Sequence, residues 1–234
     1  MSDINTALIT GANRGIGLEV AKELSKKGFQ IFLGVRDIEK AKSALAELPE
    51  LQQQSEIVML DVNNEESVKK AAKYIQSKIS HLDVLVNNAG ILIAAEQPIQ
   101  ETSSQEILTS IQTNTLGPLF VMQAFLELLL KSPFARVINV SSGAGALSNM
   151  GHWAPAYSIS KAALNAVTCQ FAAALKEYQI AVNAVCPGWV RTDMGGKIAP
   201  RSVEQGADSI VWLATEAPSN LTGKFIHDRA VIEW

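Results

Sequence analysis

The sequence is poor in the residues that build disulfide scaffolds and metal centres. Its 234 residues contain two cysteines, Cys169 and Cys186, and three histidines. The cysteines lie far apart in apolar surroundings, so we expect buried, reduced thiols of the kind found in a reducing compartment. His152 has no partner at a metal-ligand spacing, and a loop histidine is a better interpretation than a second acid or a metal ligand. We therefore expect no bound metal.

A strong charge and long apolar runs are also missing. The net charge is −3, from 20 basic and 23 acidic residues, and like charges form no block. A nucleic-acid partner is therefore not expected. Gln123 and Glu127 interrupt the apolar run over residues 120–130, and no run approaches the ~20 residues of a membrane helix. Residues 1–4 lack the features of a signal peptide. These absences favour a cytoplasmic protein without a membrane partner.

What the sequence does contain is a regular alternation of short apolar runs and helical patterns. The runs are typical of buried parallel strands and lie at residues 4–10, 29–35, 56–60, 82–86, 136–140, 180–185 and 224–227. Helical spacing of apolar residues follows in segments near residues 16–27, 38–48, 68–79, 104–131 and 154–178. No linker divides the chain. The pattern predicts one doubly wound α/β Rossmann fold over residues 1–234, with a mostly parallel seven-stranded sheet and helices on both faces.

A glycine-rich turn, Thr10-Gly11-Ala12-Asn13-Arg14-Gly15-Ile16-Gly17, joins the first strand to the first helix. Glycines permit a tight turn and let backbone N–H groups approach a pyrophosphate at the helix N-terminus. The spacing differs from the common Gly-x-Gly-x-x-Gly fingerprint, and glycines also serve plain turns. The position of the turn nevertheless favours a nucleotide. The candidate contacts are Gly11, Asn13, Arg14, Gly15, Ile16 and Gly17.

The end of the second apolar run indicates which dinucleotide binds. An acid at this point binds the ribose 2′-hydroxyl of NAD, whereas an arginine accommodates the 2′-phosphate of NADP. Here Arg36 follows the strand, and Arg14 supplies a second cation. A guanidinium can meet a phosphate with two parallel hydrogen bonds. Asp37 is a complication, because it could pair with Arg36 or contact a ribose itself. We predict NADP(H) as the cofactor.

Tyr157 and Lys161 stand four residues apart where a helical pattern begins. Residues at positions i and i+4 share one helix face. A tyrosine is a poor acid at neutral pH, but a nearby cation favours the phenolate and makes proton exchange feasible. Taken alone, such a pair is more often a packing tyrosine and a solvated lysine. The other motifs must supply the rest of a site.

Together the motifs resemble the classical short-chain dehydrogenase/reductase family. The resemblance spans essentially the whole chain and rests on Thr10-Gly11-x3-Gly15-x-Gly17, Asp61-Val62, Asn87-Asn88-Ala89-Gly90, Asn114, Ser141-Ser142, Tyr157-x3-Lys161 and Pro187-Gly188-x3-Thr192. Residues 185–194 and 223–234 resemble the carbonyl reductase branch, and that branch prefers NADPH. The resemblance therefore agrees with the interpretation of Arg14 and Arg36.

The resemblance implies a role for each matching residue. Tyr157 is the expected general acid, Ser142 binds the carbonyl oxygen, and Lys161 lowers the pKa of Tyr157 and binds the nicotinamide ribose. Asn114 is expected to anchor a water molecule leading to Lys161. The remaining implied cofactor contacts are Asp61 and Val62 at the adenine, Asn88 and Gly90 at the ribose crevice, and Pro187, Gly188, Val190 and Thr192 around the nicotinamide.

One spacing departs from the family pattern. The segment between Ser142 and Tyr157 is longer than usual, which leaves Ser141 as a rival for the role of Ser142. The extra loop, residues 149–155, is expected to edge the substrate pocket. The candidate substrate walls are Trp153, Trp189 and Met194, although core packing is an equal alternative for the two tryptophans.

The segment between Thr192 and a helix beginning near Ser202 predicts a short lid. Gly195 and Gly196 within it suggest an open, mobile site with a broad substrate range. We expect an NADPH-dependent carbonyl reductase or alcohol dehydrogenase acting on a ketone or aldehyde, assembled as a homodimer or homotetramer. One alternative is a 3-oxoacyl-carrier-protein reductase of the same family, which the ending over residues 231–234 disfavours. Another is a non-catalytic NADP(H)-binding signalling protein.

Overall fold

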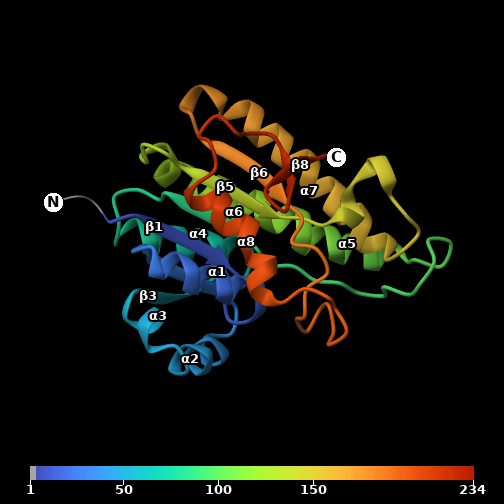
Figure 1. Ribbon diagram of the computed structural model, residues 1–234, viewed down its shortest axis with the longest axis horizontal. Helices are drawn as coiled ribbons and strands as arrows, with labels where there is room; N and C mark the ends of the chain where they lie inside the picture. The colour runs from blue at the N-terminus through green and yellow to red at the C-terminus, as the bar shows by residue number, and fades with distance from the viewer. Residues whose placement is uncertain (1–3) are drawn as a thin grey trace.

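The computed structural model describes residues 4–234, so the first three residues of the expected domain lie outside the described part. A single sheet runs through the molecule in the order β3-β2-β1-β4-β5-β6-β7-β8, with helices on both sides (Figure 1). The strands are β1 (Thr6–Thr10), β2 (Gln30–Val35), β3 (Ser55–Met59), β4 (Val84–Asn87), β5 (Arg136–Val140), β6 (Ala181–Val185), β7 (Phe225–His227) and β8 (Ala230–Ile232). The predicted doubly wound α/β fold is confirmed.

The predicted number of seven strands is wrong by one. Strands β1 to β7 pair in parallel, and β8 pairs antiparallel with β7 at the edge of the sheet. Strand β8 has three residues, too few to show a pattern. The turn before it, Asp228-Arg229, also lacks the glycine that usually marks a two-residue hairpin. Only pairing with β7 makes this segment a strand.

The helices form two layers that bury the apolar faces of the sheet. They are α1 (Gly15–Lys26), α2 (Ile38–Ala46), α3 (Pro49–Gln53), α4 (Glu65–Gln76), α5 (Ser104–Ile111), α6 (Gly117–Leu130), α7 (Pro155–Ala174) and α8 (Val203–Thr215). Apolar side chains of α1, α2, α3 and α8 pack on one face, and those of α4, α6 and α7 pack on the other. Helix α4 begins earlier than expected because Asn64 accepts a hydrogen bond from the Ser67 N–H and caps it.

Helices α5 and α6 continue one another through a π-helical turn, η1 (Gln112–Leu116). Such turns occur frequently at functional sites, and Asn114 lies in this one. The segment Ser104–Leu130 is long and apolar enough to cross a membrane, yet 56% of its most apolar window is buried inside the protein. A core helix passes the same test of length and composition, so this segment is weak evidence for a membrane span.

The strand order places a binding site at the carboxyl ends of the central strands. Strands β2 and β3 lie on one side of β1, and β4 and the later strands lie on the other side. In open α/β sheets, ligands bind at this reversal, outside the carboxyl ends of the strands. The glycine turn follows β1, Arg36 follows β2, and Asn88 follows β4. The fold therefore brings motifs that are distant in the sequence to one crevice.

Candidate active site

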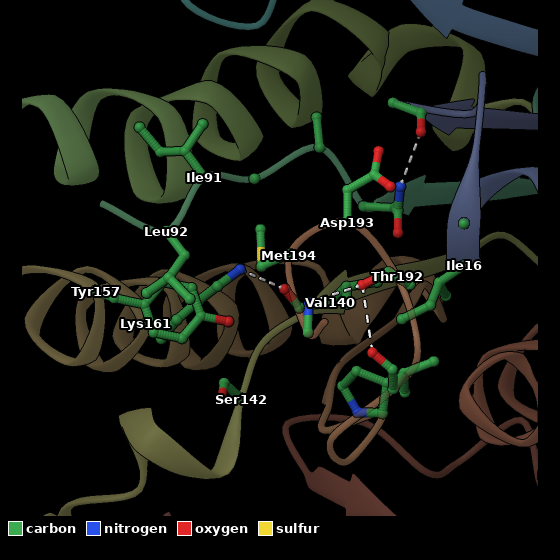
Figure 2. A pocket seen from close by; sticks show the side chains of 18 of the residues that line it. Ile16, Ile91, Leu92, Val140, Ser142, Tyr157, Lys161, Thr192, Asp193 and Met194 are labelled. Atoms are coloured by element: carbon green, nitrogen blue, oxygen red, sulfur yellow. Dashed lines mark hydrogen bonds between the residues drawn. The ribbon is translucent and has the colours of Figure 1, made fainter. Parts of the chain in front are cut away.

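A cavity of about 1340 Å³ lies at the carboxyl ends of the strands, and Figure 2 shows part of its lining. Most of the residues expected from the sequence line it: Gly11, Asn13, Arg14, Gly15, Ile16, Arg36, Asp61, Val62, Asn88, Gly90, Ser142, Trp153, Tyr157, Lys161, Pro187, Gly188, Trp189, Val190, Thr192 and Met194. Gly17 and Asn114 do not line the cavity and lie behind it.

The glycine turn has the geometry that close approach of a phosphate needs. Gly11 and Gly15 have φ angles of +66° and +55°, in the left-handed region that favours glycine. A Cβ atom on Gly17 would lie 2.4 Å from Nδ2 of Asn88, so Gly17 permits close packing rather than contact with a ligand. The Asn88 amide donates to the carbonyl oxygens of Thr10 at 2.9 Å and Gly11 at 3.2 Å. Asn88 therefore braces the turn in addition to lining the crevice.

Three cations, Arg14, Arg36 and Lys40, line the cavity near the ends of β1 and β2. Asp37 caps α2 by accepting the Lys40 N–H at 3.1 Å and pairs with Lys40 Nζ at 3.1 Å. These contacts, first the hydrogen bond from the Lys40 backbone, lower the pKa of Asp37. Within residues 4–234 Arg36 forms no ion pair, whereas Arg14 pairs with Asp193. Arg36 is therefore exposed to the cavity, and its arrangement with Arg14 and Lys40 suits the 2′-phosphate of NADP(H).

Lys40 lines the cavity, although the sequence did not predict it as a site residue. The available signal was weak, because a lysine in the first turns of an exposed helix usually extends into solvent. Only the direction in which α2 leaves β2 places this side chain at the cavity. Asp37 pairs with Lys40 rather than with Arg36, and because Asp37 also lines the cavity, its contact with a ribose stays one of the two alternatives raised above.

Tyr157 and Lys161 project from the first turns of α7 beside Ser142 (Figure 2). Their exposed fractions are 8% and 4%. The Lys161 ammonium donates to the carbonyl oxygen of Val140 at 2.7 Å and lies 5.6 Å from the centre of the Tyr157 ring. The pair expected from the spacing of four residues therefore exists, and it is buried.

Burial dominates the protonation of this pair. It raises the pKa of Tyr157 to about 12, although interaction with the Ser142 hydroxyl acts to lower it. Burial also lowers the pKa of Lys161 to about 8. The expected lowering of the Tyr157 pKa by Lys161 is therefore not seen in the protein alone. A buried site disfavours both charged forms, and the ammonium lies over the ring while one of its N–H groups donates to the Val140 carbonyl oxygen.

The two adjacent serines have different surroundings. The Ser141 hydroxyl is buried and donates to Oδ1 of Asn165 at 2.6 Å, which ties β5 to α7. Ser142 is partly exposed to the cavity, and its hydroxyl is the one that interacts with Tyr157. The geometry therefore favours Ser142 over its rival for a contact with substrate.

Asn114 connects two walls of the site from behind. Its amide accepts from the Ile91 N–H at 2.8 Å and donates to the Ile91 carbonyl at 2.9 Å. The same Nδ2 donates to Ser160 Oγ at 2.9 Å, and Ser160 donates to the Tyr157 carbonyl at 2.7 Å. Asn114 is fully buried, and its side chain thus ties the loop after β4 to the helix that carries Tyr157. The expected link through water to Lys161 stays a prediction.

Apolar side chains form the mouth of the cavity. Trp153, Trp189 and Met194 have exposed fractions of 46%, 53% and 45%, so core packing does not explain them. The Trp153 ring meets the Tyr157 ring edge-on, with centroids 6.1 Å apart. The Trp189 indole donates to the Gly195 carbonyl at 2.7 Å. Further apolar residues at the cavity that sequence analysis missed are Ile91, Leu92, Ala95 and Ile198.

The loop histidine lies at the surface, and the two ends of the lid segment lie side by side. His152 is exposed. Within residues 4–234, no group of three or more His, Cys, Asp and Glu side chains is placed to hold a metal ion. The segment between β6 and α8 returns to its own start, because Val190 and Arg201 form an isolated parallel bridge.

A doubly wound fold with a large crevice at its reversal point is typical of dinucleotide-binding proteins. This chain belongs to the short-chain dehydrogenase family, whose model, described as short chain dehydrogenase, matches residues 5–203. The resemblance expected from the motifs is confirmed.

Carbonyl reductases are among the relatives of the chain. Carbonyl reductase [NADPH] 1 of Sus scrofa is 30% identical over 280 residues, which cover 100% of this chain and 95% of the relative. The crystal structure of NADPH-bound carbonyl reductase from chicken fatty liver superposes with a TM-score of 0.90 at 32% identity, covering 99% of both chains. Carbonyl reductase Sniffer of D. melanogaster has a TM-score of 0.90 at 33% identity, covering 99% of this chain and 100% of its own.

Proposed function

We propose that this protein is an NADPH-dependent carbonyl reductase that acts on a ketone or aldehyde and works in reverse as an alcohol dehydrogenase. The observation that carries the proposal is the cluster of Tyr157, Ser142 and Lys161 in the cavity that also contains the glycine turn. Carbonyl reduction requires a phenol that donates a proton, a second hydroxyl that binds the carbonyl oxygen and a buried cation, and these three side chains supply them. The similarity to an NADPH-bound carbonyl reductase over 99% of the chain supports the same function.

The residues present fit the proposed cofactor. The left-handed glycines of the turn admit a pyrophosphate, and Arg36, with Arg14 and Lys40 nearby, suits a 2′-phosphate. We assign the adenine to Asp61 and Val62, and the ribose and nicotinamide to the remaining predicted contacts. When bound, NADPH supplies the hydride that the carbonyl carbon accepts, and the protein supplies position and electrostatics.

Tyr157 is the proposed general acid. Because burial raises its pKa to about 12, the hydroxyl is protonated at neutral pH and holds the proton that the carbonyl oxygen must receive. Ser142 donates a hydrogen bond to the same oxygen, where negative charge develops during the reaction. Tyr157 becomes a phenolate when it gives up its proton, and the nearby Lys161 ammonium stabilises that charge.

Lys161 has donors left for a second task. An ammonium group has three N–H donors, and one is directed to the Val140 carbonyl. The others are available for the nicotinamide ribose, as the family resemblance implies. With its pKa at about 8, Lys161 is mostly protonated at pH 7 and loses its charge as the pH rises through that value.

A panel of carbonyl compounds tests the function. Small, aromatic and bulky ketones and aldehydes are incubated with NADPH, and the loss of NADPH absorbance is followed at pH 7. We expect turnover of several classes, because the mouth is apolar and open at Trp153, Trp189 and Met194. Efficient turnover of a single compound would contradict the broad range. No turnover of any compound, with NADPH bound, would contradict the enzyme function itself.

Arg36→Ala tests the choice of cofactor. The dissociation constant of NADPH is expected to rise about 10- to 100-fold, since a charge-assisted contact with phosphate is lost. NADH has no 2′-phosphate, so its dissociation constant should change little. Fluorescence titration with each nucleotide measures both values. Lys42→Ala is the matched control, because Lys42 is an exposed cation of α2 that pairs with Glu39 and does not line the cavity. Equal losses for NADPH and NADH would show that Arg36 is not the phosphate site.

The alternatives considered from the sequence are less well supported. The curated relative and the solved structures described above are carbonyl reductases, not 3-oxoacyl-carrier-protein reductases. A non-catalytic signalling protein would not require Ser142, Tyr157 and Lys161 together in one cavity. The cytoplasmic location and the homodimer or homotetramer stay predictions.

A further inference from the structure

The turn between β7 and β8 contains two consecutive strained residues. Asp228 and Arg229 have φ angles of +46° and +61°, and they form the two-residue turn between His227 and Ala230. Turns of this kind favour Asn-Gly or Asp-Gly, because positive φ costs little for glycine and more for other residues. Because glycine would relieve this strain, the presence of Asp228 and Arg229 indicates that their side chains make contacts that glycine could not make.

Each of these side chains makes an ion pair with two hydrogen bonds. Asp228 accepts from Arg201 Nη1 at 3.0 Å and from Nη2 at 2.6 Å. Arg229 donates to Asp208 from Nε at 2.8 Å and from Nη2 at 2.5 Å. Paired bonds of this type fix orientation as well as distance. The two pairs lead to different places, since Asp208 belongs to α8 and Arg201 stands at the end of the lid segment.

Arg201 rests directly on the turn that lines the nicotinamide end of the cavity. A Cβ atom on Gly188 would lie 2.5 Å from Arg201 Cδ, so the arginine stem covers the open face of that glycine. The Arg201 backbone accepts from the Arg191 N–H at 2.9 Å and donates to the Trp189 carbonyl at 3.2 Å. Arg201 thus contacts Gly188 through its side chain and closes the lid segment through its backbone.

The side chain of His227, the last residue of β7, contacts the same turn. His227 Nδ1 hydrogen-bonds the carbonyl oxygen of Cys186 at 2.9 Å, directly before Pro187. Its Cε1 would lie 3.4 Å from a Cβ atom on Gly188. The β7–β8 hairpin therefore contacts the Pro187–Gly188 turn directly through His227 and indirectly through Arg201, which Asp228 binds.

We propose that Arg201 and Asp228 are positioning residues, which hold the Pro187–Gly188 turn and the base of the lid in the geometry that carbonyl reduction requires. Neither side chain needs to touch the substrate, because both act through Gly188 and through residues 189–191. Asparagine or glycine at position 228 would relieve the strain but could not make the paired bond to Arg201. The inference rests on the proposed reductase function.

Asp228→Gly and Arg229→Gly form a matched pair of variants. Each relieves the strain at one position of the same turn and removes an ion pair with two hydrogen bonds, together with one longer contact, from Asp228 to His227 at 3.5 Å or from Arg229 to Glu216 at 4.0 Å. Only the Asp228 variant removes the carboxylate partner of Arg201, whose guanidinium then keeps one hydrogen bond, from Nη2 to the Gln205 carbonyl oxygen at 3.0 Å. We expect kcat for carbonyl reduction to fall about tenfold in Asp228→Gly, a loss that corresponds to a barrier increase of about 1.4 kcal/mol. In Arg229→Gly, kcat should stay close to that of the wild type. The glycine turn and Arg36, which bind the phosphates in the proposed function, are unchanged in both variants, so NADPH affinity should fall less than kcat.

A measurement on the cofactor-free protein, which does not depend on catalysis, separates this inference from the proposed function. Hydrogen exchange of the cofactor-free protein is followed by mass spectrometry in peptides covering residues 186–201. Exchange there should be faster in Asp228→Gly than in the wild type, and unchanged in Arg229→Gly. Arg201→Lys, which keeps the charge but loses the planar fork, should give an intermediate rate.

The outcomes are distinct. Equal exchange and equal kcat in the two glycine variants would overturn the positioning role, as would a loss of thermal stability in Asp228→Gly without a change in kcat. If the wild type reduced no carbonyl compound, the proposed function would fail. The exchange comparison would still decide whether Asp228 and Arg201 hold residues 186–201.

Discussion

Tyr157→Phe is expected to lower kcat for carbonyl reduction by about 10²- to 10⁴-fold, the contribution typical of a positioned general acid. The variant keeps the ring that packs beside Trp153 and under Lys161, and it loses only the hydroxyl that donates the proton. NADPH binding should be retained, because the glycine turn and Arg36 are untouched. Steady-state assays with the best carbonyl substrate measure kcat, and fluorescence titration measures NADPH affinity.

Tyr178→Phe is the control for the loss of a phenol. Tyr178 follows α7 in the short helical turn Lys176–Tyr178, is 55% exposed, and lies outside the cavity, so its variant should behave like the wild type. Turnover retained by Tyr157→Phe would exclude the proposed acid. Loss of both turnover and NADPH binding would instead mean that the variant disturbs the cavity, and thermal unfolding would then reveal the damage.

Ser142→Ala is expected to lower kcat by about 10²- to 10³-fold, the loss typical when one donor to a developing negative charge is removed. The Ser142 side chain is small and partly exposed to the cavity, and its hydroxyl caps the short turn Gly143–Gly145 by accepting from Ala144 at 3.2 Å. Loss of this one cap should lower the free energy of unfolding by about 1 kcal/mol, which leaves the variant folded. The measurement is kcat at saturating NADPH and carbonyl substrate.

Ser141→Ala is the matched control, one residue away on the same strand end. Its hydroxyl donates to buried Asn165, so its loss leaves a buried acceptor without a partner and should lower the free energy of unfolding by about 1–3 kcal/mol. The folded protein should keep a kcat close to that of the wild type. The reverse pattern, with activity lost in Ser141→Ala and kept in Ser142→Ala, would identify Ser141 as the substrate contact.

The sequence by itself determined those features that depend on local pattern. The apolar runs and helical spacings predicted the parallel strands and the long helices, because a buried strand and an amphipathic helix impose their periods on neighbouring residues. The order of the motifs along the chain was sufficient to identify the family. The glycine turn, Arg36 and the pair Tyr157 and Lys161 were predicted because each is defined by residues close together in the chain.

Only the tertiary structure decided the features that depend on contacts between distant segments. Ser141 and Ser142 are equivalent in the sequence, and they separate only when α7 brings Asn165 to one and Tyr157 to the other. The raised pKa of Tyr157 follows from burial by several segments, which the spacing to Lys161 does not reveal.

The same reason applies at the edge of the sheet. Strand β8 is too short for a pattern and exists because β7 lies beside it. Arg201 and Asp228 are 27 residues apart, and their pairing over Gly188 arises from the return of the lid segment. Local pattern thus determines the longer elements and the motifs that they carry. Burial, protonation and the pairing of side chains require the whole chain, because they depend on neighbours that sequence order does not specify.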